Sequence, residues 1–93
     1  MKVIEDEVEK QFRTIVCDHL GVSPEQCVPQ ARIVEDLGAD ELDPIELAMS
    51  LETAFHICFT DDEISGFTTY GNLLSLVKEK FEQFTKEAYG RNA

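Results

Sequence analysis

The side chains that could do chemistry in this sequence are mostly carboxylates, and they gather in its middle. Between positions 35 and 63 there are ten acidic residues and no lysine or arginine. The acidic residues are Glu35, Asp36, Asp40, Glu41, Asp43, Glu46, Glu52, Asp61, Asp62 and Glu63. Asp40 and Asp43 could suggest acid–base catalysis. We expect no catalytic residue here, because nothing in the sequence predicts a buried cleft that would shift their pKa values.

The same segment offers oxygen ligands but no metal-binding motif. It lacks the alternating acidic and glycine pattern of an EF-hand, so at most a weak surface site for Ca²⁺ or Mg²⁺ is expected. The cysteines (Cys17, Cys27 and Cys58) and histidines (His19 and His56) show neither CxxC nor zinc-site spacing. We therefore predict no defined metal site and no disulfide, and interpret the cysteines as small buried hydrophobic residues.

The overall charge limits the partners that the protein could have. The formal net charge is −11 on 93 residues, and it lies almost entirely in the central segment. Such a segment repels nucleic-acid phosphates and attracts basic protein surfaces. It could simply keep a small domain in solution, but its one-sidedness favours a docking surface.

No membrane or export signal is evident in the sequence. No apolar run approaches the roughly 20 residues of a membrane helix. The first nine residues are mostly charged, which is untypical of a signal peptide. We expect a monomeric cytoplasmic protein that binds neither nucleic acid nor membranes.

Apolar residues recur at helical spacing along the whole chain. A first helix is predicted over residues 4–20, with an apolar stripe of Val8, Phe12, Ile15, Val16 and His19. Gly21 followed by Val22 is a typical helix stop, with glycine in the left-handed position. Residues 23–26 have the cap, proline and glutamine of a short helical turn. A loop then continues to Gly38.

A second helix is predicted over residues 42–56. Its apolar arc comprises Leu42, Ile45, Leu47, Ala48, Met49, Leu51 and Phe55, which we assign to the core. Its opposite side carries Asp43, Glu46, Ser50 and Thr53. One face is thus expected to pack inward and the other to be partly acidic.

The start of this second helix has two competing caps. Asp40 could cap with Asp43, or Asp43 could cap with Pro44 first in the helix and Glu46 closing the box. The second register is favoured, because in the first register Pro44 could not donate the first intrahelical bond. We therefore expect the turn that holds Glu41 to be irregular, with regular helix from about Pro44.

Two further helices complete the expected architecture. Thr60 opens a capping box with Glu63, and Gly66 ends this short helix. Thr68 or Thr69 caps a last helix to about residue 89, with a stripe of Leu73, Leu74, Val77, Phe81, Phe84 and Ala88. Residues 1–93 are therefore predicted to form one all-α domain, a small four-helix bundle.

The stretch before and into the second helix resembles the acyl carrier proteins of fatty-acid and polyketide synthesis. Residues 34–47 read VEDLGADELDPIEL, and the family pattern here is roughly DLGADSLD-x-[VI]-EL. Leu20-Gly21-Val22 and the threonines before the last helix also look like the family. The resemblance extends over about residues 4–80, and the long last helix beyond Phe81 is extra.

The family's serine at this motif receives a 4′-phosphopantetheine arm, whose thiol carries the growing acyl chain. In this sequence Glu41 stands at that position. The resemblance therefore implies an altered prosthetic-group site, and we expect no covalent cofactor. Glu41 could imitate the charge of a loaded carrier, be a neutral result of drift, or be an engineered change that blocks modification.

The family also docks on basic surfaces of acyl-chain synthesis enzymes through acids of its second helix. Carried over by position, the docking residues are Asp40, Leu42, Asp43, Glu46, Met49 and Glu52. Thr53 and Ala54 stand where family members often continue with acids. Phe59 replaces a smaller aliphatic residue, which suggests an altered or filled acyl cavity.

The resemblance favours a non-enzymatic, carrier-like module without a covalent substrate, in or beside a lipid-synthesis pathway. Two alternatives stay open. The chain could be a true carrier whose serine was mutated, or an acidic regulator that blocks a basic site on an unrelated partner.

Overall fold

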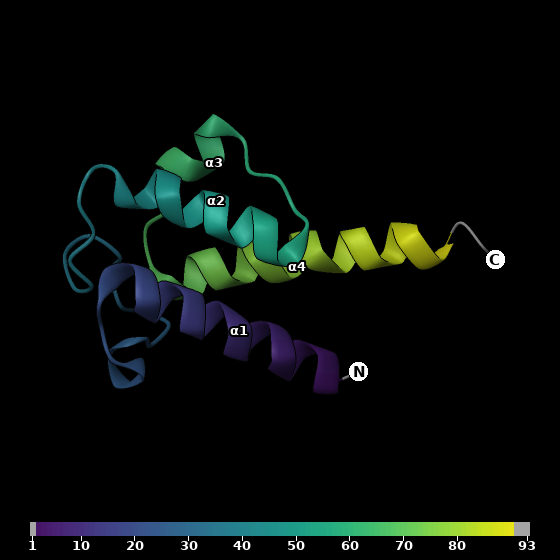
Figure 1. Ribbon diagram of the computed structural model, residues 1–93, viewed down its shortest axis with the longest axis horizontal. Coiled ribbons are helices and arrows are strands. Elements are labelled where there is room, and N and C mark those ends of the chain that lie inside the picture. The colour runs from purple at the N-terminus through teal and green to yellow at the C-terminus, as the bar shows by residue number, and fades with distance from the viewer. Residues whose placement is uncertain (1, 91–93) are drawn as a thin grey trace.

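The computed structural model describes the backbone of residues 2–90 and the side chains of residues 7–85. The order of elements is α1 (Lys2–Leu20), the short 3₁₀ turn η1 (Pro24–Gln26), α2 (Asp43–Phe55), α3 (Asp61–Ser65) and α4 (Tyr70–Gly90). Figure 1 shows α1, α2 and α4 side by side, with the short α3 lying beside α2 on the side away from α1. The described chain is thus the all-α, four-helix bundle that the sequence predicts.

The core lies where the three long helices meet. Phe12 of α1, Leu47 and Leu51 of α2, and Leu73 and Val77 of α4 are fully buried. Burying one such side chain contributes about 1.5–3 kcal/mol of transfer free energy. The helix pairing therefore depends mainly on the buried stripes that the helical periodicity picks out.

The apolar arc predicted for α2 is wider than the face that its neighbours cover. Leu47, Ala48, Leu51 and Phe55 are buried, but Leu42, Ile45 and Met49 are 63%, 50% and 61% exposed. Their assignment to the core is wrong. Periodicity gives the side of a helix on which apolar residues lie, but it does not say how much of that side other elements cover.

Residues at the helix ends behave largely as their types predict. Gly21 ends α1 with φ 67°, and its N–H bonds the carbonyl of Cys17 at 2.8 Å. Thr60 caps α3, accepting from the N–H of Glu63 at 3.1 Å, and the Glu63 carboxylate accepts from the N–H of Thr60 at 2.9 Å. At the start of α4, the Thr69 hydroxyl accepts from the N–H of Asn72 at 3.0 Å.

The prediction that α2 ends at about His56 is confirmed within one residue, but the way in which the helix ends was not anticipated. His56 takes the left-handed conformation there (φ 56°), a position that helices usually give to glycine. Its ring stacks on Phe84 of α4 with centroids 5.8 Å apart. Phe84 itself is 42% exposed, so its assignment to the core stripe is wrong. Ala88 of the same stripe lies outside the described side chains.

The long segment between η1 and α2 is docked onto the start of α4. The N–H of Ile33 bonds the carbonyl of Thr68, that of Tyr70 bonds Ala31, and that of Gly71 bonds Pro29. Loop residues Ala31, Ile33, Leu37 and Ala39 are buried in the core. The segment that leads to Glu41 is therefore anchored by backbone bonds and apolar packing, although it contains almost no regular structure.

The cysteines lie in three different environments. Cys27 is buried, Cys17 is half-buried, and Cys58 is exposed, so the assignment of Cys58 to the interior is wrong. The Cys17 and Cys27 sulfur atoms lie 3.6 Å apart across α1 and the loop. No helix in the part of the chain that the structure describes is long and apolar enough to cross a membrane.

Replacing Gly71 by alanine tests how closely the loop and α4 approach. A Cβ atom at Gly71 would lie 2.8 Å from the carbonyl oxygen of Pro29. Alanine normally stabilises a helix relative to glycine by about 1 kcal/mol, but this backbone clash should reverse the sign. We expect Gly71→Ala to lower the free energy of unfolding by about 1–3 kcal/mol in urea titrations.

Gly66 is the matched control for this substitution. A Cβ there would meet its nearest atom, the carbonyl oxygen of Asp62, at an ordinary 3.5 Å. Gly66→Ala should change the free energy of unfolding by less than about 0.5 kcal/mol. Equal stability of Gly71→Ala and the native chain would show that the loop does not press on α4 in this way.

The cysteines should differ in their rate of alkylation, because they lie in different surroundings. Burial and the neighbouring Cys17 thiol raise the pKa of Cys27 to about 11. At pH 8 only about one Cys27 in a thousand is then the reactive thiolate. Mass spectrometry after iodoacetamide treatment of the native protein should find Cys58 modified first and Cys27 last, and fast modification of Cys27 would contradict its burial.

Candidate functional site

Two carboxylates close the turn that precedes α2. Asp40 Oδ1 accepts from the N–H groups of Leu42 at 2.9 Å and Asp43 at 3.1 Å. In return, Asp43 Oδ2 accepts from the N–H of Asp40 at 2.8 Å. Each carboxylate thus satisfies backbone donors that the start of a helix leaves without partners. The turn is held at both ends by its own side chains.

This arrangement corrects the capping register favoured from the sequence. Asp43 does not cap the helix with Glu46; it pairs backwards with Asp40. The first backbone bond of α2 runs from the N–H of Glu46 to the carbonyl of Leu42 at 3.1 Å. Pro44 is the second residue of α2, where a missing N–H removes no intrahelical bond.

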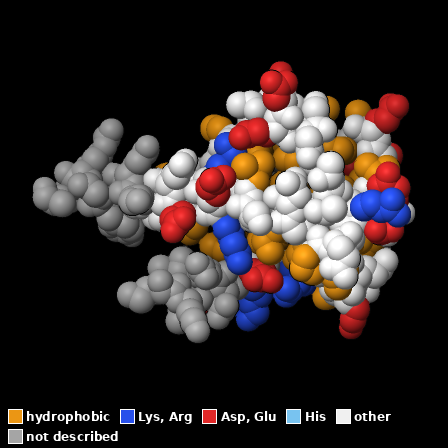
Figure 2. Space-filling model, turned by 180° about the vertical axis from the view of Figure 1, so that it is seen from behind, with side chains coloured by type: hydrophobic (Ala, Val, Ile, Leu, Met, Phe, Trp, Pro, Cys, Tyr) orange, Lys and Arg blue, Asp and Glu red, His pale blue; other side chains and the backbone are white. Residues whose placement is uncertain are grey.

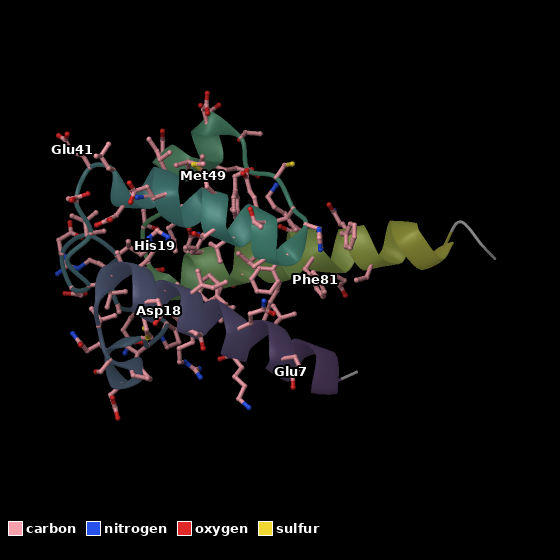
Figure 3. The ribbon with its side chains drawn as sticks, viewed as in Figure 1. Glu7, Asp18, His19, Glu41, Met49 and Phe81 are labelled. Carbon is pink, nitrogen blue, oxygen red and sulfur yellow. The ribbon has the colours of Figure 1, made fainter. Side chains whose placement is uncertain are left out.

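The expectation of an irregular turn at Glu41 is confirmed. Glu41 and Leu42 precede the regular helix, which begins at Asp43. Glu41 is exposed, and Figure 3 shows it at the outer edge of the turn, away from the bundle. Within residues 7–85 its side chain forms no hydrogen bond or ion pair. Its charge stands close to the positive end of the α2 dipole, which favours an anion.

An exposed apolar strip runs from this turn along α2. Leu42, Ile45 and Met49 follow one another at intervals that place them on one helix face. Glu46 is exposed beside them. We call these residues, Leu42, Ile45, Glu46 and Met49, the α2 surface. Of its members, Ile45 is absent from the docking residues predicted from the sequence, although it lies between Leu42 and Met49 in the helical pattern.

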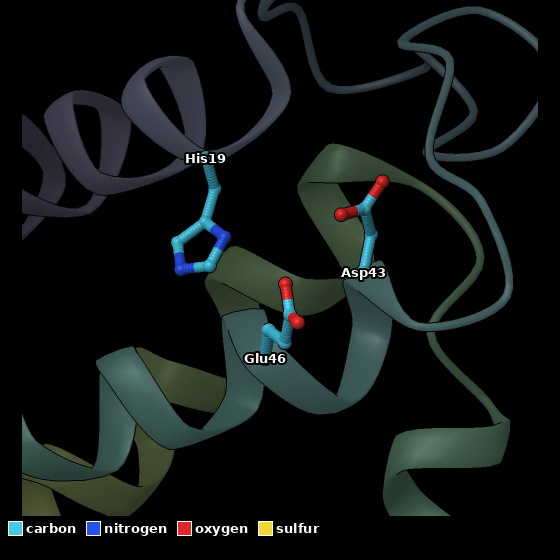
Figure 4. A group of neighbouring side chains, drawn as sticks. All are labelled: His19, Asp43 and Glu46. Atoms are coloured by element: carbon cyan, nitrogen blue, oxygen red, sulfur yellow. The ribbon is translucent and has the colours of Figure 1, made fainter.

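Two of the other predicted docking acids are directed elsewhere. Asp43 is half-buried, and with Glu46 it lies beside His19 from the last turn of α1 (Figure 4). Glu52 is also half-buried, and its Oε2 accepts from the N–H of Phe59 at 2.9 Å. Glu52 therefore helps to hold the connection from α2 to α3.

The acidic segment contains carboxylates that form an ion pair with a base and carboxylates that do not. The N–H and guanidinium groups of Arg32 lower the pKa of Asp36. The N–H of Thr60 and the ammonium of Lys80, at 3.0 Å, lower the pKa of Glu63. In contrast, no lysine or arginine among the described side chains forms an ion pair with Asp40, Glu41, Asp43 or Glu46.

The basic side chains are found on other parts of the molecule. Figure 2 shows lysine and arginine side chains beside acidic ones on the face turned away in Figure 1. Arg13 and Lys78 both pair with Glu9, at 3.2 and 3.5 Å. The negative charge around the start of α2 is thus left uncompensated by ion pairs with the described bases.

Comparison with known proteins agrees with the motif and the fold. The sequence profile of a family described as "Phosphopantetheine attachment site" matches residues 10–77. An acyl carrier protein of Thermosynechococcus vestitus is 38% identical over 76 residues, which cover 82% of this chain and 94% of the relative. Both matches include the turn at Glu41 and all of α2.

The helical bundle, the motif at the start of α2 and these two matches agree with one another. The profile covers well over half of the chain, and the relative is similar along nearly its whole length. This chain belongs to the acyl carrier protein family, the carriers of acyl-chain biosynthesis.

Proposed function

We propose that this protein is an acyl-carrier-type docking module of acyl-chain synthesis that carries no phosphopantetheine arm at position 41. The observation that carries this proposal is Glu41, exposed at the tip of a turn that its neighbours Asp40 and Asp43 hold in place. The turn is built to present one side chain to a partner enzyme. The side chain presented here lacks the hydroxyl nucleophile.

The chemistry of arm attachment explains why the exchange matters. A serine hydroxyl that attacks the coenzyme A pyrophosphate forms a stable phosphodiester and releases adenosine 3′,5′-bisphosphate. A carboxylate in the same place would form an acyl phosphate, a mixed anhydride that water cleaves. Glu41 therefore cannot hold the arm durably, and the other serines lie outside the motif.

Glu41 retains one property of the modified serine, its negative charge. A phosphodiester and a carboxylate each carry about one negative charge at neutral pH. The start of α2 stabilises an anion in this position by about 0.3–1 kcal/mol. Glu41 thus lets the protein occupy carrier-binding sites as if it were loaded, without offering a thiol.

The α2 surface and the neighbouring acids that have no described lysine or arginine partner supply the contact with partners. Leu42, Ile45 and Met49 offer apolar area that a partner can bury, and Glu46 with Asp40 and Asp43 adds charge. Exposed charge pairs contribute little affinity individually, but together they steer association and select partners. The partners are basic surfaces of acyl-chain synthesis enzymes, met by a monomeric, non-enzymatic protein in the cytoplasm.

The packing of Phe59 supports a changed interior for acyl chains. Phe59 is 9% exposed and meets Phe67 edge-on, with ring centroids 5.3 Å apart. A ring of this size takes the place of a smaller aliphatic residue in the family pattern. The space that remains for an apolar chain behind α3 is correspondingly smaller.

Intact-mass analysis tests the absence of the arm. The native chain and Glu41→Ser are incubated with coenzyme A and a promiscuous phosphopantetheinyl transferase. We expect no pantetheine adduct on the native chain and a complete adduct on Glu41→Ser, because the turn and the α2 surface are otherwise intact. An adduct on the native chain would overturn the proposal, and a lack of adduct on both would show that the docking surface no longer fits this enzyme class.

Surface plasmon resonance with an immobilised carrier-dependent synthase tests the docking surface. In buffer with a metal chelator, Glu46→Lys should slow association at least tenfold at low salt, and added salt should reduce the difference. Glu25→Lys is the control, because Glu25 is exposed on η1, away from the α2 surface. Equal losses in both variants would mean that net charge alone governs binding.

The same assay distinguishes between the interpretations of Glu41 as a charge mimic and as a result of neutral drift. If its charge imitates a loaded carrier, Glu41→Ala should weaken binding about two- to fivefold, whereas Glu41→Asp should restore most of it. Unchanged binding of Glu41→Ala would disprove the imitation and favour neutral drift. In a separate pull-down, enrichment of a partner without carrier chemistry would favour the acidic-regulator alternative.

A further inference from the structure

One cluster of metal-ligating side chains is not explained by docking. His19 of α1 and Asp43 and Glu46 of α2 place one ligand atom each within 4.8 Å of one another. Figure 4 shows the imidazole of His19 facing the two carboxylates across the gap between the helices. Asp43 and Glu46 lie three positions apart on α2, and the fold brings His19 of α1 beside them.

The orientation of the His19 ring suits metal binding. Its Nε2 lies 2.8 Å from the hydroxyl of Ser50, while Nδ1 is directed toward Asp43 and Glu46 (Figure 4). When Nε2–H donates to Ser50, Nδ1 keeps the lone pair that a metal ion requires. Metal-binding histidines commonly use the second nitrogen in this way, because the bond fixes the tautomer and the ring plane.

The positions of the Asp43 and Glu46 carboxylates and their lack of a basic partner among the described residues also suit a cation. Asp43 is held in place by the N–H of Asp40 at 2.8 Å, and neither Asp43 nor Glu46 has a described lysine or arginine as an ion-pair partner. The positive end of the α2 dipole opposes a cation, but it corresponds to only about half an elementary charge. Two full negative charges outweigh it.

We propose that His19, Asp43 and Glu46 form a site for a divalent transition metal of the zinc type, with water completing the coordination. One imidazole and two carboxylates are ligands that suit zinc, whereas Ca²⁺ and Mg²⁺ prefer oxygen ligands alone. Ligand atoms around tetrahedral zinc stand about 3.4 Å apart for bonds of about 2.0–2.1 Å. Glu46, the exposed member, closes the remaining distance by rotating its side chain.

Such a site would join the end of α1 to the start of α2. The two helices are otherwise linked there by the Ser50–His19 bond and by core packing. A metal bound only to the folded protein raises its stability by mass action. This proposal does not depend on the role of Glu41 and can succeed or fail separately from the proposed function.

Calorimetric titration of the tag-free protein with Zn²⁺ tests the site. The chain carries Cys58→Ser, because the exposed Cys58 thiol could bind zinc itself. We expect one Zn²⁺ per chain, and at least tenfold weaker binding in His19→Gln and in Glu46→Gln. Glu35→Gln removes an equal charge from the acidic segment outside the cluster, and it should change the affinity less than twofold.

Three further measurements serve as controls. Circular dichroism establishes that each variant is folded, and Ser50→Ala should weaken zinc binding while leaving all three ligands in place. Ca²⁺ titration should show weaker binding that His19→Gln does not alter. Zinc affinity within tenfold of the parent chain in His19→Gln, or no binding at millimolar Zn²⁺, would overturn the proposal.

Discussion

The reciprocal bonding of Asp40 and Asp43 determines how this end of the molecule is built. Because each carboxylate accepts from the other's backbone N–H, the chain enters α2 at a fixed point, two residues beyond Glu41. That point places Pro44 where its missing N–H does no harm and directs Leu42, Ile45 and Met49 outward. It also turns Asp43 toward α1 and leaves Glu41 alone at the edge. The exposed strip, the placement of Asp43 beside His19 and the isolated Glu41 side chain all adjoin this one pair of hydrogen-bonded side chains.

Much of the fold could be predicted because the helices obey local rules. Gly21 and Thr60 mark helix ends by their own chemistry, and the stripes of α1 and α4 follow the 3.6-residue period. The exposure of Ile45 could not be predicted, since it depends on how far α3 and α1 extend over α2. The close approach of Gly71 to Pro29 likewise joins residues distant in sequence. The capping register failed for a different reason: Pro44 ruled out a regular first turn, but not a turn closed by side chains alone.

In the folded chain, the carboxylates of the acidic segment make different contacts and therefore have different roles. Asp36 and Glu63 bond nearby backbone and bases, and Glu52 holds the connection to α3. The acids around the start of α2, in contrast, form no ion pair with a described lysine or arginine, so their charge stays available to a partner. Counting charges in the sequence identifies the segment, but the count cannot separate these groups, because the separation arises from contacts of single carboxylate oxygens. The family motif predicts where the site lies, and the structure shows which of its acids face outward.

The isolation of the Glu41 side chain has a consequence for how such a protein can change over time. Its backbone is held by its neighbours, and its side chain contacts nothing else among the described residues, so folding places almost no demand on which residue stands there. Selection at this position can therefore act on chemistry alone. A carrier can lose its attachment point, or regain one, by a substitution at this position while the rest of the chain stays as it is. Carriers and non-carriers can then differ at this one residue and both fold stably.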